Sequence, residues 1–139
     1  MVRIILAAIA GFIAWSILWV GSDQVLMSAM PDWYGAHQLG FERAMTNKEA
    51  FAPDMTILVM HIVRSIIISI MSGFLAAMIA GENRRSPLIL GVLLLLFGIM
   101  VEVMAWNYLP IWYHIVFLAL LIPMTLLGGR LKSSAPAAA

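Results

Sequence analysis

Four long apolar segments separated by short polar stretches constrain this chain more than any other feature of its sequence. A helix needs about 20 mostly apolar residues to cross a bilayer, because the hydrocarbon core is about 30 Å thick. The segments predict helices over about 4–30, 53–80, 87–107 and 110–128. We therefore expect an all-α fold, a four-helix transmembrane bundle that runs up-down-up-down. It forms one domain (1–132) with an outer loop at 31–52 and a flexible tail at 133–139.

The composition agrees with a membrane protein. The chain is 63% hydrophobic and 11% charged, and its mean hydropathy is +1.00. A soluble domain is about 45–50% apolar and about 25% charged. Cysteine is absent, which excludes disulfides, thiolate catalysis and cysteine-ligated metals. The net charge is +1 and no basic cluster is interleaved with aromatic residues, so we expect no nucleic-acid partner.

The first apolar segment has an alternative interpretation as a signal peptide, with Arg3 in the basic region that would precede it. The apolar stretch runs from Ile4 to Val20, which is longer than the about 7–15 residues typical of such a peptide. No Ala-x-Ala cleavage site follows it. We therefore expect an uncleaved membrane helix.

The distribution of lysine and arginine predicts the orientation of the bundle. Cytoplasmic connections carry an excess of these residues. One side of a four-span arrangement holds most of them: Arg3, Arg84, Arg85, Arg130 and Lys132. Tryptophan and tyrosine gather at the opposite boundary, as in an interfacial belt. We therefore expect both termini in the cytoplasm and a multi-pass protein of the bacterial plasma (inner) membrane.

Local signals predict several helix ends. Ser86 followed by Pro87 is typical of a helix start, because the serine can accept a free N–H and proline lacks one. Gly81 and Gly128 suit the left-handed position just past a helix end. The spacing of "TNKE" (46–49) is that of a capping box, which predicts a short helix beginning there.

Ionisable residues interrupt all four apolar segments. At a rise of about 1.5 Å per residue, they lie about 22–28 Å from the cytoplasmic end. Such residues usually face the bundle interior and pair with one another. We expect them to meet in one layer, where Arg64 has two candidate counter-ions, Glu102 first and Asp23 second. The complete polar cluster is Arg64, Glu102, Asp23, His61 and His114.

Small residues mark one face of the second segment. Ser65, Ser69, Gly73 and Ala77 recur every four residues, a spacing that lets another helix approach closely. We expect this face to be the helix-packing face. His37, in the outer loop, is expected to be a solvated residue.

The polar cluster has one structural and several functional interpretations. As a structural lock it sets the register of the helices; as a gate it forms part of a proton or anion pathway. His61 and His114 could ligate haem, but no C-x-x-C-H motif is present. A metal site is disfavoured because the E-x-x-H pattern is missing and Arg64 would repel a cation. A triad built from Ser22, Asp23 and a histidine lacks a nucleophile elbow.

The end of the chain, "NYLPIWYHIVFLALLIPMTLLGGRL" (107–131), resembles small four-span bacterial inner-membrane proteins. The resemblance implies a four-helix membrane fold and names no reaction, substrate or site residue. We expect a non-catalytic accessory or scaffold subunit in the lipid bilayer, in a homo-oligomer or a larger membrane complex. The alternative is a small transporter or channel component gated by the Arg–Glu–His cluster, and haem or metal binding ranks third. We expect no catalytic residue, no cofactor and no metal.

Overall fold

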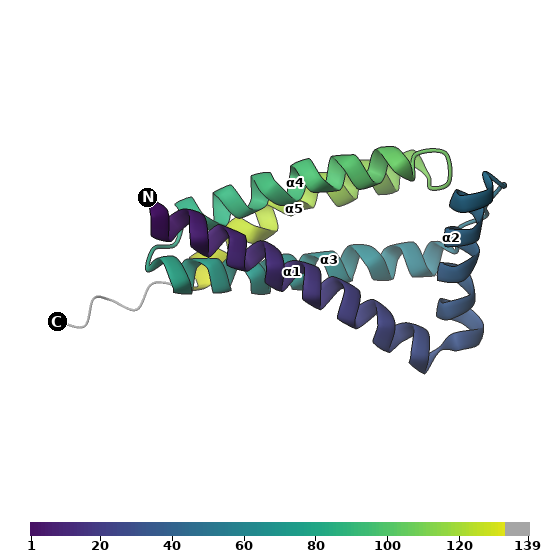
Figure 1. Ribbon diagram of the computed structural model, residues 1–139, viewed down its shortest axis with the longest axis horizontal. Helices are drawn as coiled ribbons and strands as arrows, with labels where there is room; N and C mark the ends of the chain where they lie inside the picture. Colours follow the sequence, from purple (N-terminus) through teal and green to yellow (C-terminus); the bar gives the residue numbers. More distant parts are fainter. Residues whose placement is uncertain (133–139) are drawn as a thin grey trace.

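The computed structural model describes residues 1–132, which are all-helical apart from short connections (Figure 1). The elements are α1 (Val2–Ala29), a π-helical turn η1 (Pro31–Gly35), α2 (Ala36–Asn47), α3 (Met55–Ala80), α4 (Arg85–Met104) and α5 (Ile111–Leu131). Four of them, α1, α3, α4 and α5, are long and apolar enough to cross a membrane. The prediction of an all-α chain with four candidate spans is therefore confirmed. The predicted tail at 133–139 lies outside the described residues.

The stretch predicted as an outer loop, 31–52, is itself largely helical. It holds η1 and α2, which together turn the chain across one end of the long helices (Figure 1). The predicted helix start at 46–49 is wrong, because α2 ends at Asn47 and Lys48 takes a left-handed conformation with φ of 55°. The other predicted helix ends differ from the observed ones by no more than three residues, as at 107 against Met104.

Both ends of α3 have a clear local cause. The Asp54 carboxylate accepts the backbone N–H groups of Thr56 at 2.8 Å and Ile57 at 3.3 Å, which begins the helix. Gly81 follows the last residue of α3 with φ of 74°, the left-handed conformation that glycine adopts without strain. The prediction for Gly81 is confirmed.

The start of α4 depends on Glu82 in the preceding turn. Its carboxylate accepts the backbone N–H groups of Arg84, Arg85 and Ser86 at 2.9, 2.7 and 2.7 Å. Partial burial opposes ionisation, but these three N–H groups outweigh it and lower the pKa of Glu82 to about 2. The prediction that Ser86 caps the helix is wrong, because Glu82 already binds the free N–H groups and the Ser86 side chain is buried.

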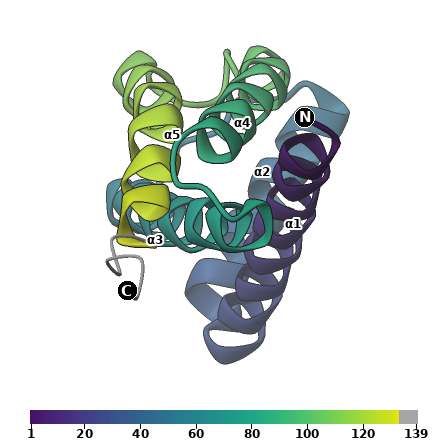
Figure 2. The ribbon, with the colours of Figure 1, turned by 90° about the vertical axis from the view of Figure 1, so that its left-hand side faces the viewer.

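The most extensive helix contact joins α3 to α5. A methyl group on Gly73 would collide with the backbone of Thr125, and one on Gly128 with the carbonyl of Ile70. The two backbones therefore touch, as in membrane helices that pack through small residues. Figure 2 shows the C-terminal part of α5 beside α3. The prediction that Gly128 lies past the helix end is wrong, since α5 continues to Leu131.

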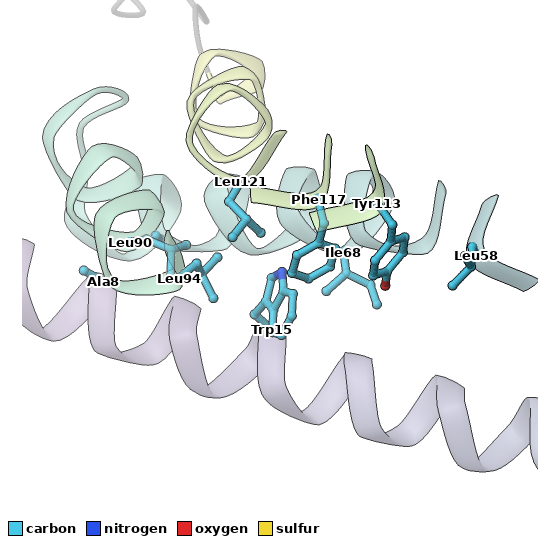
Figure 3. Packing of buried hydrophobic residues seen from close by; sticks show 10 residues of the cluster. Ala8, Trp15, Leu58, Ile68, Leu90, Leu94, Tyr113, Phe117 and Leu121 are labelled. Carbon is cyan, nitrogen blue, oxygen red and sulfur yellow. The ribbon is translucent and has the colours of Figure 1, made fainter. Parts of the chain in front are cut away.

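The apolar core lies where α1, α3, α4 and α5 converge. Figure 3 shows Trp15 of α1 facing Phe117 of α5, with Leu90 and Leu94 of α4 nearby. The Trp15 indole N–H donates to Ser69 of α3 at 3.0 Å, so the largest core side chain keeps its one polar group satisfied. Beyond this core, the second half of α1 diverges from α4 (Figure 1).

Candidate functional site

Arg64 lies in the first half of α3 and turns toward α1. Its guanidinium contacts the Asp23 carboxylate at 3.5 Å, the Tyr34 hydroxyl, and the carbonyl oxygen of Trp19 at 3.3 Å. It also lies 4.0 Å from the centre of the Trp19 ring, in a cation–π contact. The side chain is only 10% exposed. Its charge is thus balanced within the protein, although the Nε atom has no partner in the described chain.

Tyr34 of η1 is the centre of this cluster and is fully buried. Its hydroxyl donates to Asp23 at 2.5 Å and accepts from Arg64. Burial and then the hydrogen bond to Asp23 raise the pKa of Tyr34 above its ordinary range. The phenol therefore stays protonated and acts as a fixed donor to Asp23.

His61 of α3 connects the cluster to Tyr113 of α5. Its Nε2 atom lies 3.0 Å from the Tyr34 hydroxyl, and its Nδ1 atom lies 3.4 Å from the Tyr113 hydroxyl. Because the Tyr34 proton already goes to Asp23, Nε2 of His61 must donate to Tyr34. Nδ1 is then an acceptor for the Tyr113 hydroxyl proton. The donors therefore run in one direction, from Tyr113 through His61 and Tyr34 to Asp23.

The helix α2 is held over this cluster by its own histidine. The backbone N–H of Asp54 donates to Nε2 of His37 at 3.1 Å, so Nδ1 carries the proton and donates to Gln38 at 3.1 Å. The Gln38 amide in turn donates to Asp23 at 3.2 Å. Trp33 donates to the Asp54 carboxylate at 2.9 Å; this bond, with the N–H groups at the start of α3, lowers the pKa of Asp54.

Glu102 of α4 and His114 of α5 form a separate buried pair. The His114 ring bonds to one carboxylate oxygen of Glu102 through Nδ1 and donates from Nε2 to the carbonyl of Trp106 at 3.4 Å. The Trp106 ring stacks on His114, with centroids 4.7 Å apart. Whether the shared proton lies on the imidazole or on the carboxyl, the pair carries no net charge.

The structure separates the predicted polar cluster into two groups. Arg64, Asp23 and His61 belong to one, and Glu102 with His114 to the other. Within residues 1–132, the only ion pairs closer than 4.0 Å are Arg64–Asp23 and His114–Glu102. The prediction that Glu102 is the main partner of Arg64 is therefore wrong. The cause is direction: Arg64 turns toward α1, whereas Glu102 meets the neighbouring helix α5.

The sequence reasoning missed Tyr34, and it assigned His37 wrongly. Both lie in the stretch taken as a loop, where no periodic pattern indicates burial. The only signal was the density of aromatic residues near Tyr34, which we interpreted as an interfacial belt. His37 is not a freely solvated residue, because both of its ring nitrogens have partners.

The predicted packing face of α3 is buried along its whole length. Ser65, Ser69, Gly73 and Ala77 are each inaccessible or nearly so. Ser69 contacts α1 through Trp15, and Gly73 contacts α5 through the backbone of Thr125. One face therefore serves two neighbouring helices.

The histidines are poorly placed for metal or haem. In the described part of the chain, no three His, Asp or Glu residues come together as a metal site. His61 uses both ring nitrogens for Tyr34 and Tyr113, and His114 uses both for Glu102 and Trp106. Axial ligation of haem would have to break these hydrogen bonds.

A cavity of about 420 Å³ lies between the two polar groups. It is enclosed by α1, α2 and the adjoining parts of α3, α4 and α5, and most of its lining is apolar. His61 and Glu102, one from each polar group, both reach its wall. The cavity is thus the place where the embedded polar residues of this protein can meet a ligand.

Comparison of the chain with protein-family models, curated proteins and solved structures gives no match.

Proposed function

We propose that this protein is a non-catalytic integral membrane protein of the bacterial inner membrane, an accessory or scaffold subunit of a membrane assembly. The observation that carries the proposal is the closed pairing of its embedded charges. Arg64 is balanced by Asp23, and Glu102 is balanced by His114. Charges arranged in this way hold helices in register and leave no unbalanced charge for a substrate.

Each polar group connects elements that apolar packing alone would connect less specifically. The Arg64 group joins α3 to α1 and to η1, through Asp23 and Tyr34. The Glu102–His114 pair joins α4 to α5. Apolar contacts between membrane helices allow several relative positions of similar free energy, whereas a buried hydrogen bond requires one geometry. We infer a structural lock in two parts.

The orientation proposed for the four spans is up-down-up-down with both termini in the cytoplasm. It is supported by the basic residues at one end of the bundle, where Arg3 of α1 donates to the carbonyl of Ile79 in α3 at 2.7 Å. Arg84 and Arg85 follow in the next turn. Lys and Arg near span ends favour the cytoplasmic side.

The orientation is tested with single cysteines, since the natural chain contains none. Lys48→Cys, beyond α2, is expected to react with a membrane-impermeant maleimide in intact spheroplasts. Asn83→Cys, in the α3–α4 turn, is expected to react only after the membrane is permeabilised. The reverse pattern would overturn the proposed orientation.

The scaffold proposal is tested by mass in a mild detergent. We expect the protein to elute from size exclusion with light scattering as a multiple of 15.3 kDa, or with a stoichiometric partner. A monomer across all mild detergents and in nanodiscs would contradict it. The experiment is run on the full chain, with detergent mass subtracted.

A second candidate function, a proton-pathway component, is favoured by one observation. The donors at Tyr113, His61 and Tyr34 point in series toward Asp23, as in a proton relay. Proteoliposomes loaded with a pH-sensitive dye discriminate the two functions. A relay predicts proton entry that His61→Phe abolishes. The scaffold proposal predicts the same slow leak for wild type, His61→Phe and empty vesicles.

A further inference from the structure

The cavity of about 420 Å³ has the size of a ligand site and a mostly apolar lining. Small-molecule pockets span about 300–1,000 Å³ and combine an apolar lining with a few placed polar groups. Here the apolar part includes Trp15, Trp19 and Phe117. The lining also has side chains with polar atoms: Ser16, His37, Gln38, His61, Glu102 and Tyr113. His37, His61 and Tyr113 have hydrogen-bond partners of their own, so Gln38 of α2 and Glu102 of α4 are the groups considered for a ligand. A ligand that fills the cavity would therefore be mostly apolar and carry a polar group.

Glu102 supplies a hydrogen-bonding atom that its pairing with His114 does not use. One carboxylate oxygen bonds to His114, and the other forms no hydrogen bond within residues 1–132. The Glu102 side chain is only 6% exposed. Because Glu102 lines the cavity, this oxygen is available to a ligand that donates a hydrogen bond.

Gln38 supplies the complementary group. Its amide nitrogen carries two protons, and the hydrogen bond to Asp23 uses one of them. The second is available for an acceptor atom of the ligand. A hydroxyl group can both donate to Glu102 and accept from Gln38, which neither an ether nor a hydrocarbon can do.

The charges near the cavity favour a neutral ligand. Glu102 is neutralised by His114 and Asp23 by Arg64, and the lining contains no lysine or arginine. A phosphate or carboxylate would face Glu102 without a cation of its own. Anionic lipid headgroups are therefore poor ligands for this cavity.

Helices α1 and α4, which diverge in Figure 1, both line the cavity. Three lining residues are also exposed on the outer surface of the protein. The exposed fraction is 58% for Val20 of α1, and 40% for Val101 and 61% for Met104 of α4. Both helices are candidate membrane spans. The route into the cavity is thus lateral, from the hydrocarbon part of the bilayer, and this step rests on the membrane placement proposed above.

We infer that the cavity binds a single-chain lipid with a neutral hydroxyl end, such as a long-chain alcohol. The chain enters between α1 and α4 and lies along the aromatic wall. The hydroxyl lies between Glu102 and Gln38. This role goes beyond scaffolding, since it makes the protein a carrier or sensor of a membrane-dissolved alcohol.

The test uses a photoreactive hexadecanol with a diazirine in its chain, added to the full protein in nanodiscs. After irradiation, mass spectrometry is expected to find labels on cavity residues such as Phe117 and Leu121. The methyl ether of the same probe, which cannot donate, is expected to label these residues about fivefold less, the effect of one lost hydrogen bond. The corresponding hexadecanoic acid is expected to label them less as well.

A matched pair of variants on α4 tests the route. Val101→Trp places a large side chain at the cavity mouth and is expected to reduce cavity labelling about tenfold. Val103 is 66% exposed and lies outside the lining, so Val103→Trp is expected to leave the labelling unchanged. Circular dichroism and thermal melting of both variants show whether they fold, and only a folded Val101→Trp is scored.

Three results would overturn the inference. The first is labelling spread over lipid-facing residues at the same density as in the cavity. The second is equal cavity labelling by the alcohol and its methyl ether, or stronger labelling by the acid. The third is unchanged cavity labelling in folded Val101→Trp; if that variant does not fold, the comparison of the three probes on wild type still decides.

Discussion

Replacing Tyr34 by phenylalanine removes one oxygen atom and tests the Arg64 part of the lock at its centre. The hydroxyl makes three hydrogen bonds, to Asp23, Arg64 and His61. The ring of Tyr34 is fully buried, so the variant keeps the apolar packing. Any loss of stability then reports the hydrogen bonds alone.

The magnitude follows from the number and kind of these bonds. Side-chain hydrogen bonds in membrane proteins average about 0.6 kcal/mol and reach about 1.7 kcal/mol. Three bonds, two of them to charged partners, therefore amount to about 2–5 kcal/mol. Arg64 can recover part of this by moving closer to Asp23, which now lies 3.5 Å away. We expect a loss of about 3 kcal/mol.

The assay is reversible unfolding in mixed micelles, in which the mole fraction of sodium dodecyl sulfate is raised and helicity is followed by circular dichroism. Tyr108→Phe is the matched control, because the Tyr108 hydroxyl has no hydrogen bond to any described side chain or backbone group. We expect the control to change the free energy of unfolding by less than about 0.5 kcal/mol. If Tyr34→Phe is as stable as Tyr108→Phe, the hydroxyl does not hold the cluster together and the reasoning is refuted.

Three further predictions use the same unfolding assay. Arg64→Met alone should destabilise the protein by about 3–5 kcal/mol, because it leaves the Asp23 charge buried without its partner. Adding Asp23→Leu removes that charge and should restore most of the lost stability. Equal instability of the single and double variants would contradict the pairing. Gly73→Ala should destabilise by several kcal/mol because its methyl group meets the backbone of α5, whereas Gly21→Ala, where a methyl group has open space, should be nearly neutral. The pKa of Glu82 is lowered from 4.5 to about 2 in the folded protein, so its stabilising contribution is present above pH 4.5 and is lost as the pH falls toward 2. The stability of Glu82→Gln should therefore fall less than that of the wild type over this range. Parallel stability curves for the two proteins would exclude this capping role.

The polar clusters also show how a small membrane protein limits the cost of embedded charge. A charged residue at the bilayer centre costs at least about 2.5–3.5 kcal/mol on insertion scales. Here Arg64 contacts the Trp19 ring and the Asp23 carboxylate of α1. Glu102 contacts the His114 ring of α5. Both arrangements bring the charge to a partner from a neighbouring helix, so they stabilise the tertiary structure and no single helix.

The sequence predicted Asp23 only as the second of two candidate counter-ions of Arg64. Counting residues along the helices placed Asp23, Glu102 and His114 at similar heights to Arg64. Height alone cannot distinguish the acids, because it contains no information on the direction in which each side chain leaves its helix. The structure resolves this: Arg64 faces α1, and the equal heights of Glu102 and His114 reflect their own pairing.

The number and approximate limits of the spans, the glycine that ends α3 and the buried face of that helix follow from the sequence alone. Each is a property of residues close together along one helix, where apolar length, left-handed conformations and four-residue spacing act locally. The tertiary structure alone decided the counter-ion of Arg64, the central position of Tyr34 and the cavity beside Glu102. These depend on how α1 diverges from α4 and how α2 folds over the gap, and such geometry arises only when side chains from distant segments pack together.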